Sequence, residues 1–448
     1  MKATKLSLKC LCLVAALLGV NSWTAHARNP IIANRGVTDP HIHIFNGRAY
    51  LYATHDTAIT YTNRFHMENW WCWSSDDLVN WKLESILRPE QTYLRRPFNQ
   101  CWATDAAFRN GKYYWYFSEF NQRTGVVVGD SPTGPWTSPL EKPLLDSPLT
   151  PTDEYDPTVF RDDDGQFYIV FGVRNYHIAR LNEDMISLAE QPRELVRLDE
   201  NGKPILADDK NYLHKYHGNY YLSWGCNYAM STNLYGPYQF KRTLFRVENF
   251  EPGYEKPTWP NGVQQGRHGN FFEWNNQWYF AYCDMSQTGN RRFRDAFISY
   301  VHYRANGEIA DIKVDGIGVG EYDLKRGRIE AENYFAAINM EKQAIPGGFA
   351  VKATKPGGAL TFPNIHGLTN CTQIALQFSS VGASGKVEIR ERGPDGPLLA
   401  ECKVRPRGSA SAPHTVTARF KRRPVGETLF LKFQTPASVT FDAFNLSP

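Results

Sequence analysis

The sequence predicts an all-β protein in which a five-bladed β-propeller is followed by a β-sandwich of the jelly-roll kind. A hairpin motif recurs five times, windows with apolar residues at helical spacing are scarce, and no tryptophan follows Trp278. These patterns divide the chain into a signal peptide over residues 1–27, a propeller over residues 28–322 and a sandwich over residues 326–448.

The first residues show the three parts of a secretory signal. Lys2, Lys5 and Lys9 precede an apolar run over residues 10–20, and a small-x-small cleavage site follows at residues 25–27. The apolar run is too short to span a bilayer, and no later stretch is apolar enough to do so. We therefore expect a secreted or periplasmic protein without membrane insertion.

Charge and cysteine usage exclude several classes of partner. The chain has 50 basic and 46 acidic residues, so it has no strong field to attract polyanions, and we expect no nucleic acid as a partner. The six cysteines outside the predicted signal are widely and irregularly spaced, which excludes a zinc motif. Disulfides and buried thiols both remain open, and the oligomeric state is not predicted.

The repeat consists of a polar turn followed by a run of aromatic and β-branched residues. An apolar strand precedes each turn, so each copy predicts a β-hairpin. The copies recur every 53 to 64 residues, which accommodates about four short strands, and five such sheets in series are typical of a propeller. A single large β-sandwich would explain the strands but not the period. The turns are Asn46-Gly47, Asn110-Gly111, Asp164-Gly165, His217-Gly218 and Asn275-Asn276.

Polar residues recur near the start of the first strand of each hairpin. In order along the chain they are Asp39, Asp105, Asp156, Asp209 and His268. The innermost strands of a propeller surround its axis, so we expect these side chains to line one funnel. Crowded carboxyls raise each other's pKa, which supplies the protonated acid and ionised base that glycoside hydrolysis needs. The alternative is that they cap strand starts, and Asp105 is the member most expected to be structural.

Several segments resemble glycoside hydrolase family 43, over roughly residues 30 to 320. They are Thr38-Asp39-Pro40-His41-Ile42, Ser75-Asp76-Asp77-Leu78-Val79-Asn80-Trp81, Trp102-Ala103-Thr104-Asp105 and Tyr155-Asp156-Pro157-Thr158. The resemblance implies a five-bladed propeller and, in most members, inverting hydrolysis of polysaccharides that contain arabinose, xylose or galactose. It also implies that the chemistry requires no cofactor.

The resemblance implies roles for three of the aspartates. Asp39 matches the general base, and Asp156 matches the carboxylate that orients the acid. The family's general acid is a Glu, whereas the aligned residue here is Asp209, and displacing a reacting group by about 1 Å can cost two orders of magnitude in rate. Three outcomes stay open: Asp209 serves as the acid, Glu255 in the insertion between blades four and five replaces it, or the site is weakly active.

Further residues are expected to bind substrate or ions. Trp73 and Trp102 are candidate stacking walls for sugar rings, and Asp105, Arg267 and His268 are candidate binding residues near the axis. His268 matches a family position at which a histidine often helps to hold a metal ion or water.

The C-terminal part resembles a family 6 carbohydrate-binding module in Ile329-Glu330-Ala331-Glu332 and in the segment around Asp442. The resemblance implies a structural calcium held by Glu330, Glu332 and Asp442, whose oxygens suit that ion. Because this part lacks tryptophan, sugar binding and simple bracing of the propeller both remain open.

The expected function is therefore that of a secreted inverting glycoside hydrolase acting on side chains of a plant-type polysaccharide. α-L-Arabinofuranosidase activity leads, with β-xylosidase or β-galactofuranosidase activity as the alternative on the same fold. A non-catalytic glycan-binding protein is the alternative from another class. In each case the expected partner is an oligo- or polysaccharide.

Overall fold

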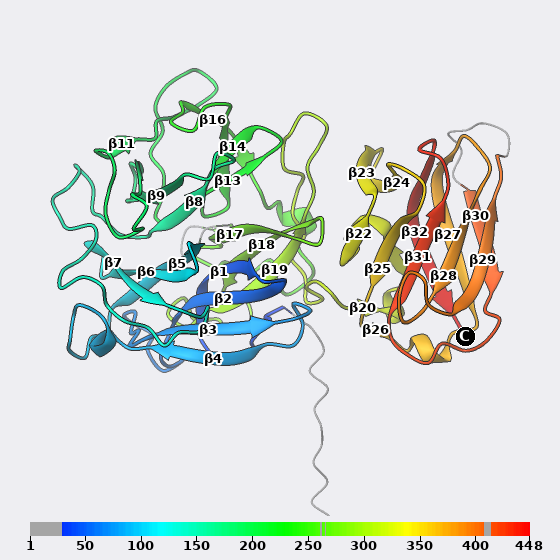
Figure 1. The fold of residues 1–448 in the computed structure, drawn as a ribbon, viewed down its shortest axis with the longest axis horizontal. Helices are drawn as coiled ribbons and strands as arrows, with labels where there is room; N and C mark the ends of the chain where they lie inside the picture. Colours follow the sequence, from blue (N-terminus) through cyan, green and yellow to red (C-terminus); the bar gives the residue numbers. More distant parts are fainter. Residues whose placement is uncertain (1–28, 260–261, 265, 407–413) are drawn as a thin grey trace, which may run out of the picture.

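The computed structural model describes residues 29–259, 262–264, 266–406 and 414–448, and the predicted signal peptide lies outside them. The described chain is built of strands and five short 3-10 helices, so it is an all-β protein, as predicted (Figure 1). None of its helices is long and apolar enough to cross a membrane. The helices are η1 (Pro89–Gln91), η2 (Val247–Asn249), η3 (Leu324–Arg326), η4 (Ala331–Asn333) and η5 (Leu368–Asn370).

Five antiparallel sheets form the blades of the propeller. Blade 1 consists of β1 (Val37–Phe45), β2 (Arg48–His55), β3 (Trp70–Ser75) and β4 (Lys82–Leu87). Blade 2 consists of β5 (Cys101–Arg109), β6 (Lys112–Glu119) and β7 (Arg123–Gly129). Blade 3 consists of β8 (Thr158–Arg161), β9 (Phe167–Phe171), β10 (His177–Arg180) and β11 (Arg193–Glu194).

Blades 4 and 5 complete the ring. Blade 4 consists of β13 (Asn211–Tyr216), β14 (Asn219–Trp224), β15 (Asn227–Ser231) and β16 (Tyr238–Thr243), with β12 (Arg197–Leu198) added in parallel at its outer edge. Blade 5 consists of β17 (Gly269–Trp274), β18 (Gln277–Asp284) and β19 (Asp295–Val301).

Blades 2 and 5 differ from the expected four strands. Their sheets have three, and an isolated bridge takes the place of the outer strand, from Val128 to Thr137 in blade 2 and from Tyr303 to Ile309 in blade 5. Pro132 and Pro135 explain the difference in blade 2, because proline cannot donate to a strand ladder.

The five predicted hairpins are confirmed by their turns. At Asn46-Gly47 both turn residues have positive φ, at 52° and 76°, as a two-residue turn between twisted antiparallel strands requires. Asparagine and glycine tolerate this conformation better than other residues. In the fifth turn Asn275 and Asn276 have φ of 57° and 64°, so asparagine takes the place of glycine.

Apolar clusters join each blade to its neighbours around the ring. Five separate clusters each combine residues of two adjacent blades, and Leu51 of blade 1 shares one with Tyr279 of blade 5. The first described residues close the ring on β19. The Asn29 side chain bonds both the N–H and the C=O of Ile298, at 2.8 and 2.9 Å, and the Ile31 N–H donates to the Ala296 carbonyl.

The C-terminal part is a β-sandwich with its own apolar core. One sheet contains β21 (Arg328–Glu330), β23 (Met340–Ile345), β24 (Gly348–Ala353), β27 (Gln373–Val381), β30 (His414–Arg419) and β32 (Val439–Ser447). The other contains β22 (Ala336–Ile338), β25 (Gly358–Phe362), β28 (Gly385–Arg390), β29 (Leu398–Val404) and β31 (Leu429–Gln434). A small pair joins β20 (Tyr322–Asp323) to β26 (Ile365–His366).

The sandwich is seated on the hairpin of blade 5, beside β17 to β19 (Figure 1). The Gln277 side chain donates to the carbonyls of Glu332 and Tyr334, at 2.8 and 2.9 Å. The Asn276 side chain donates to the Ala337 carbonyl at 2.7 Å. The second asparagine of this turn therefore has a role that glycine could not fill.

The cysteine question is settled for the described residues. Their cysteines are all buried thiols without a disulfide: Cys72, Cys101, Cys226, Cys283, Cys371 and Cys402.

Candidate active site

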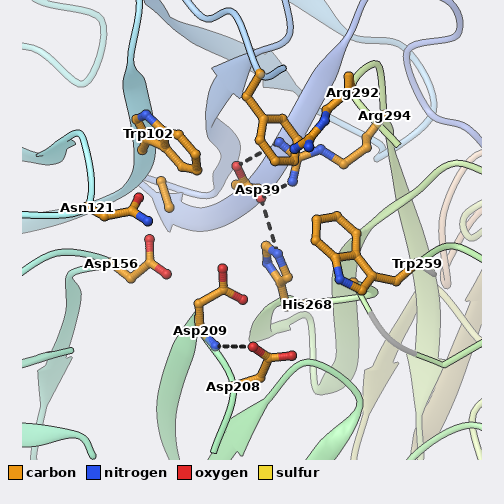
Figure 2. Close-up of a pocket in the computed structure, with 13 residues that line it drawn as sticks. Asp39, Trp102, Asn121, Asp156, Asp208, Asp209, Trp259, His268, Arg292 and Arg294 are labelled. Atoms are coloured by element: carbon orange, nitrogen blue, oxygen red, sulfur yellow. Dashed lines mark hydrogen bonds and ion pairs between the residues drawn. The ribbon is translucent and has the colours of Figure 1, made fainter. Parts of the chain in front are cut away.

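A cavity of about 250 Å³ opens at one end of the propeller axis (Figure 2). Every blade contributes to its wall or floor, as do the loops between blades. The lining residues are Asp39, Phe65, Trp102, Ala103, Asn121, Asp156, Asp208, Asp209, Trp259, Gly266, His268, Arg292 and Arg294. Of the residues predicted to meet at the axis, Asp39, Asp156, Asp209 and His268 do so.

The hairpin register accounts for three of the side chains that line the cavity, those of Asp39, Ala103 and His268, whereas Asp156 and Asp209 each lie eight positions before their turn. Asp39, Ala103, Lys210 and His268 each lie seven positions before the first residue of their turn. Blade 2 therefore presents Ala103 to the cavity instead of Asp105, and a register shift between Trp102 and Thr104 accompanies this change.

Three axial residues have a backbone conformation that is rare outside glycine. Asp39, Asp156 and Lys210 have φ of 47°, 56° and 60°. Such conformations persist where the surrounding structure enforces them, and they cluster at functional sites. In blade 1 the conformation coincides with a register shift between Thr38 and His41, which reorients the Asp39 side chain relative to the strand.

Asp39 is an ionised carboxylate held by an arginine. Its Oδ1 lies 3.0 Å from Arg294 Nη1 and 3.5 Å from His268 Nε2, and Arg294 also pairs with the buried Asp56. Burial alone would raise the pKa of Asp39, but the cationic groups of Arg294, His268 and Lys210 hold it below its ordinary value.

Asp156 and Asp209 are shifted in the opposite direction. Burial raises the pKa of both carboxyls, and the charge of Asp209 raises that of Asp156 further. Asp156 Oδ2 accepts a hydrogen bond from the backbone N–H of Lys210 at 2.8 Å, which fixes one carboxyl while leaving the other free to carry a proton. In Figure 2 both carboxyls point into the cavity that Asp39 faces. One cavity thus contains an ionised carboxylate and a pair that retains a proton at higher pH.

Lys210 is a functional candidate that sequence reasoning missed. Its side chain is buried, and its Nζ has no hydrogen-bond partner. Burial lowers its pKa, opposed by the four carboxylates of Asp156, Asp105, Asp39 and Asp209. The signal was present in the sequence, because Lys210 occupies the same repeat position as Asp39 and His268.

His268 is positioned to carry positive charge. Burial lowers its pKa, but the Cys283 sulfur and the carboxylates of Asp39 and Asp209 outweigh burial and raise it to about 9. Asp39, His268 and Cys283 offer three donor atoms within 4.8 Å of one another, so they could hold an ion. Arg294 already contacts both Asp39 oxygens, so protein groups alone supply cationic charge at this carboxylate.

Asp105 is structural, which corrects its assignment as a binding residue. It is fully buried and does not line the cavity. Its carboxylate contacts His41 Nδ1 and His43 Nε2 at 2.7 and 2.6 Å and accepts the backbone N–H groups of Ala106 and Val159. The two imidazoles hold its pKa well below the ordinary value, against the effect of burial. The carboxylate therefore ties blades 1, 2 and 3 together.

Three more predicted residues also lie away from the cavity. Trp73 packs in the apolar cluster between blades 1 and 5. Arg267 is fully buried, pairs with Asp284 and donates to the Tyr254 carbonyl at 2.8 Å. Glu255 is exposed, and its carboxylate accepts the backbone N–H of Gly253. Packing and loop support, instead of substrate contact, explain these three side chains.

The cavity also contains residues that the sequence did not single out. Arg294 holds Asp39 from 255 positions further along the chain. Trp259, Phe65 and Asn121 line the opening together with Trp102. Of these residues, only Arg294 had a local signal in the sequence. That signal was the dense basic run at residues 291–294, directly before β19.

The predicted calcium ligands in the sandwich are not gathered around one point. The carboxylate oxygens of Glu330, Glu332 and Asp442 do not all lie within 4.8 Å of one another. Arg328 pairs instead with both Glu330 and Asp442 at 2.9 Å. A guanidinium thus supplies positive charge to two of the three expected ligands, whereas the buried Glu332 Oε2 has no hydrogen-bond partner.

Comparison with known proteins agrees with this geometry. The model of the glycosyl hydrolases family 43 matches residues 27–309. A xylosidase/arabinosidase of Bacteroides ovatus is 28% identical over 330 residues, covering 62% of this chain and 95% of the relative. An arabinoxylan arabinofuranohydrolase of Paenibacillus polymyxa is 24% identical over 495 residues, covering 94% of this chain and 74% of the relative.

Two solved structures are also similar. A family 43 enzyme of Xanthomonas citri in complex with xylotriose superposes with a TM-score of 0.54 at 27% identity, covering 64% of this chain and 94% of the other. The arabinoxylan arabinofuranohydrolase of Bacillus subtilis, in complex with cellotetraose, has a TM-score of 0.56 at 23% identity, covering 95% and 98%. The similarity to the Bacillus subtilis structure therefore covers the sandwich as well as the propeller.

Proposed function

The chain belongs to glycosyl hydrolases family 43 and is a glycosidase, and we propose that it removes α-L-arabinofuranosyl groups from a plant-type polysaccharide with inversion at the anomeric carbon. The observation that supports this most strongly is the opposed pKa shifts over one cavity. Arg294, His268 and Lys210 hold the pKa of Asp39 below its ordinary value, whereas burial raises the pKa of Asp209. Hydrolysis with inversion needs one group in each state.

In the proposed reaction Asp39 removes a proton from water as the water oxygen attacks the anomeric carbon. Asp209 gives its proton to the glycosidic oxygen as that bond breaks, so charge and atoms balance. Asp156, whose Oδ2 accepts the Lys210 N–H, has a pKa raised by burial and by the charge of Asp209, and we assign it to orienting this acid. The Trp102 and Trp259 side chains flank the opening, where they can pack against the apolar faces of sugar rings (Figure 2).

The stereochemical outcome tests the mechanism directly. Proton NMR during hydrolysis of an aryl α-L-arabinofuranoside should show the β-anomer of arabinose first, with the α-anomer appearing only by mutarotation. Initial release of the α-anomer would assign a retaining mechanism and remove Asp39 from the role of base.

β-Xylosidase activity is the second candidate, because the B. ovatus relative is named for both activities. A panel of aryl arabinofuranoside, xyloside and galactofuranoside separates the possibilities. Hydrolysis of the arabinofuranoside at the highest kcat/KM supports the leading assignment, and a higher value for the xyloside reverses the order.

We also propose that the protein is exported and that the sandwich braces blade 5 rather than binding sugar. The signal-like composition of residues 1–27 supports export, and sequencing the N-terminus of the mature protein tests it. The hydrogen bonds from Gln277 and Asn276 into the sandwich support bracing. Full-length Gln277→Ala should melt at a lower temperature, with unchanged retention on immobilised arabinoxylan.

A further inference from the structure

A second cavity adjoins the first and is lined differently. It has a volume of about 280 Å³ and shares Phe65, Trp102 and Arg292 with the reactive cavity. Asn63, Arg64, Asn99 and Gln100 complete its lining. These residues come from the loops before β3 and β5, and Arg292 comes from the loop before β19. The two cavities therefore form neighbouring compartments that share two aromatic rings and one guanidinium.

The two compartments differ in the charged groups that line them. The reactive cavity is lined by four carboxyls, those of Asp39, Asp156, Asp208 and Asp209, together with the cationic side chains of His268, Arg292 and Arg294. No carboxyl lines the second cavity, which has two arginines and three amides among its described lining residues. An anionic sugar would meet carboxyls in the first compartment, whereas the charged groups that line the second are all positive.

Arg292 is a guanidinium without an anionic partner among the described residues. It lies over the Phe65 ring at 4.0 Å, which fixes its plane, but it forms no ion pair among the described residues, and its buried Nε has no hydrogen-bond partner. The neighbouring Arg294 is paired with Asp39 and Asp56, and the buried Arg267 is paired with Asp284. Burial and the charges of Arg291 and Arg294 lower the pKa of Arg292, as expected for an uncompensated cation.

We propose that this second cavity is a subsite for a uronic acid unit of the polysaccharide, next to the neutral sugar that is cleaved. This inference rests on the proposed function. The planar fork of a guanidinium matches a carboxylate in two parallel hydrogen bonds. The amides of Asn63, Asn99 and Gln100 can bond sugar hydroxyls, and Trp102 offers a ring face. The preferred substrate is thus an acidic polysaccharide whose charged unit lies beside the scissile linkage.

The test compares one oligosaccharide in two charge states. A uronosyl-bearing arabinoxylan oligosaccharide and its carboxyl-reduced form are equal in size, and an aryl arabinofuranoside measures basal activity. We expect the wild type to show about a tenfold higher kcat/KM on the acidic form, as for a charge-assisted pair, and this preference to shrink with added salt. Arg64→Gln should lose part of the preference, because it removes one of the two guanidiniums of the second cavity, and should keep the aryl activity, because Arg64 lines only that cavity.

Arg96→Gln is the matched control, because Arg96 is exposed in the same loop region and lines neither cavity. Equal kcat/KM on both oligosaccharides, with normal aryl activity, would overturn the subsite and leave the proposed function standing. If the aryl glycoside is not cleaved, the proposed function fails instead. Calorimetric binding of the acidic oligosaccharide to Asp209→Asn, with and without Arg64→Gln, then decides the subsite: weaker binding with Arg64→Gln supports it, and equal binding overturns it.

Discussion

The ion pair between Asp39 and Arg294 at the propeller axis is buried, whereas the pair between Asp442 and Arg328 in the C-terminal sandwich remains near water. The side chains of Asp39 and Arg294 are 6% and 7% exposed, but those of Asp442 and Arg328 are 21% and 40% exposed. Both regions consist of antiparallel strands with apolar cores. The difference arises because five strand ends converge in the propeller, so its polar residues must share one small space.

The comparison shows which region of the protein has the charged side chains expected of a reactive site. Buried charges that are incompletely neutralised have shifted pKa values and can exchange protons, which is the state expected of a reactive site. Exposed pairs such as Arg328 with Glu330 contribute little energy. The following variants separate the two behaviours, from the largest expected effect to the smallest.

Removing an axial carboxylate should abolish turnover but spare the fold. Asp39→Asn and Asp156→Asn should each lower kcat by about three orders of magnitude, the range for general acid–base groups. Arg294 keeps Asp56 as a partner in Asp39→Asn, so the melting temperature should change little. Asp105→Asn is the contrasting variant, because it should cost about 2 kcal/mol of stability through its buried hydrogen bonds. Near-normal kcat in Asp39→Asn would end its assignment as the base.

Replacing Asp209, the proposed acid, by glutamate should lower kcat less than replacing it by asparagine. Asp209→Glu should lower kcat by about two orders of magnitude, because the added methylene displaces the carboxyl by about 1 Å. Asp209→Asn should lower it further on substrates with poor leaving groups. Steady-state kinetics on aryl glycosides of graded leaving-group pKa provide the measurement. A glutamate variant that exceeds the wild type would show that the site is adapted to the longer acid.

Removing the axial ammonium should shift the pH profile. Asp39 acts ionised and Asp209 acts protonated, so activity falls as pH drops through the lowered pKa of Asp39 and as it rises through the raised pKa of Asp209. Lys210 lowers the pKa of Asp39. In Lys210→Met the acidic limb should therefore move to higher pH, and kcat should fall about tenfold. Lys203→Met in the exposed loop of the same blade should leave the profile unchanged.

Changing the sandwich should have the smallest effect. Arg328→Ala should lower the melting temperature by about 1–2 °C, since exposed ion pairs are worth up to about 1 kcal/mol. Its kcat should equal that of the wild type.

A chelator should leave the wild-type melting temperature unchanged. A fall of several degrees would show that Glu330, Glu332 and Asp442 hold an ion and would reverse our assignment to Arg328.

Local signals predicted the fold better than the site. Each turn dipeptide carries its own conformational preference, so the five hairpins could be predicted from residues adjacent in the chain. The axial set depended on register, and a single shift near Trp102 was enough to replace Asp105 by Ala103. The role of Arg294 could not be assigned from the basic run at residues 291–294 alone, because its pairing with Asp39 joins two segments 255 positions apart in the chain.

The short segment at Asn29 and Ile31 also determines when the propeller can be completed. Its partners in β19 lie up to 269 residues later, so the first part of the ring to be synthesised is the last to find its place. Contacts of such long sequence separation slow folding. Until β19 exists, blade 1 retains an uncovered apolar face. The nascent chain therefore needs protection from aggregation throughout most of its synthesis.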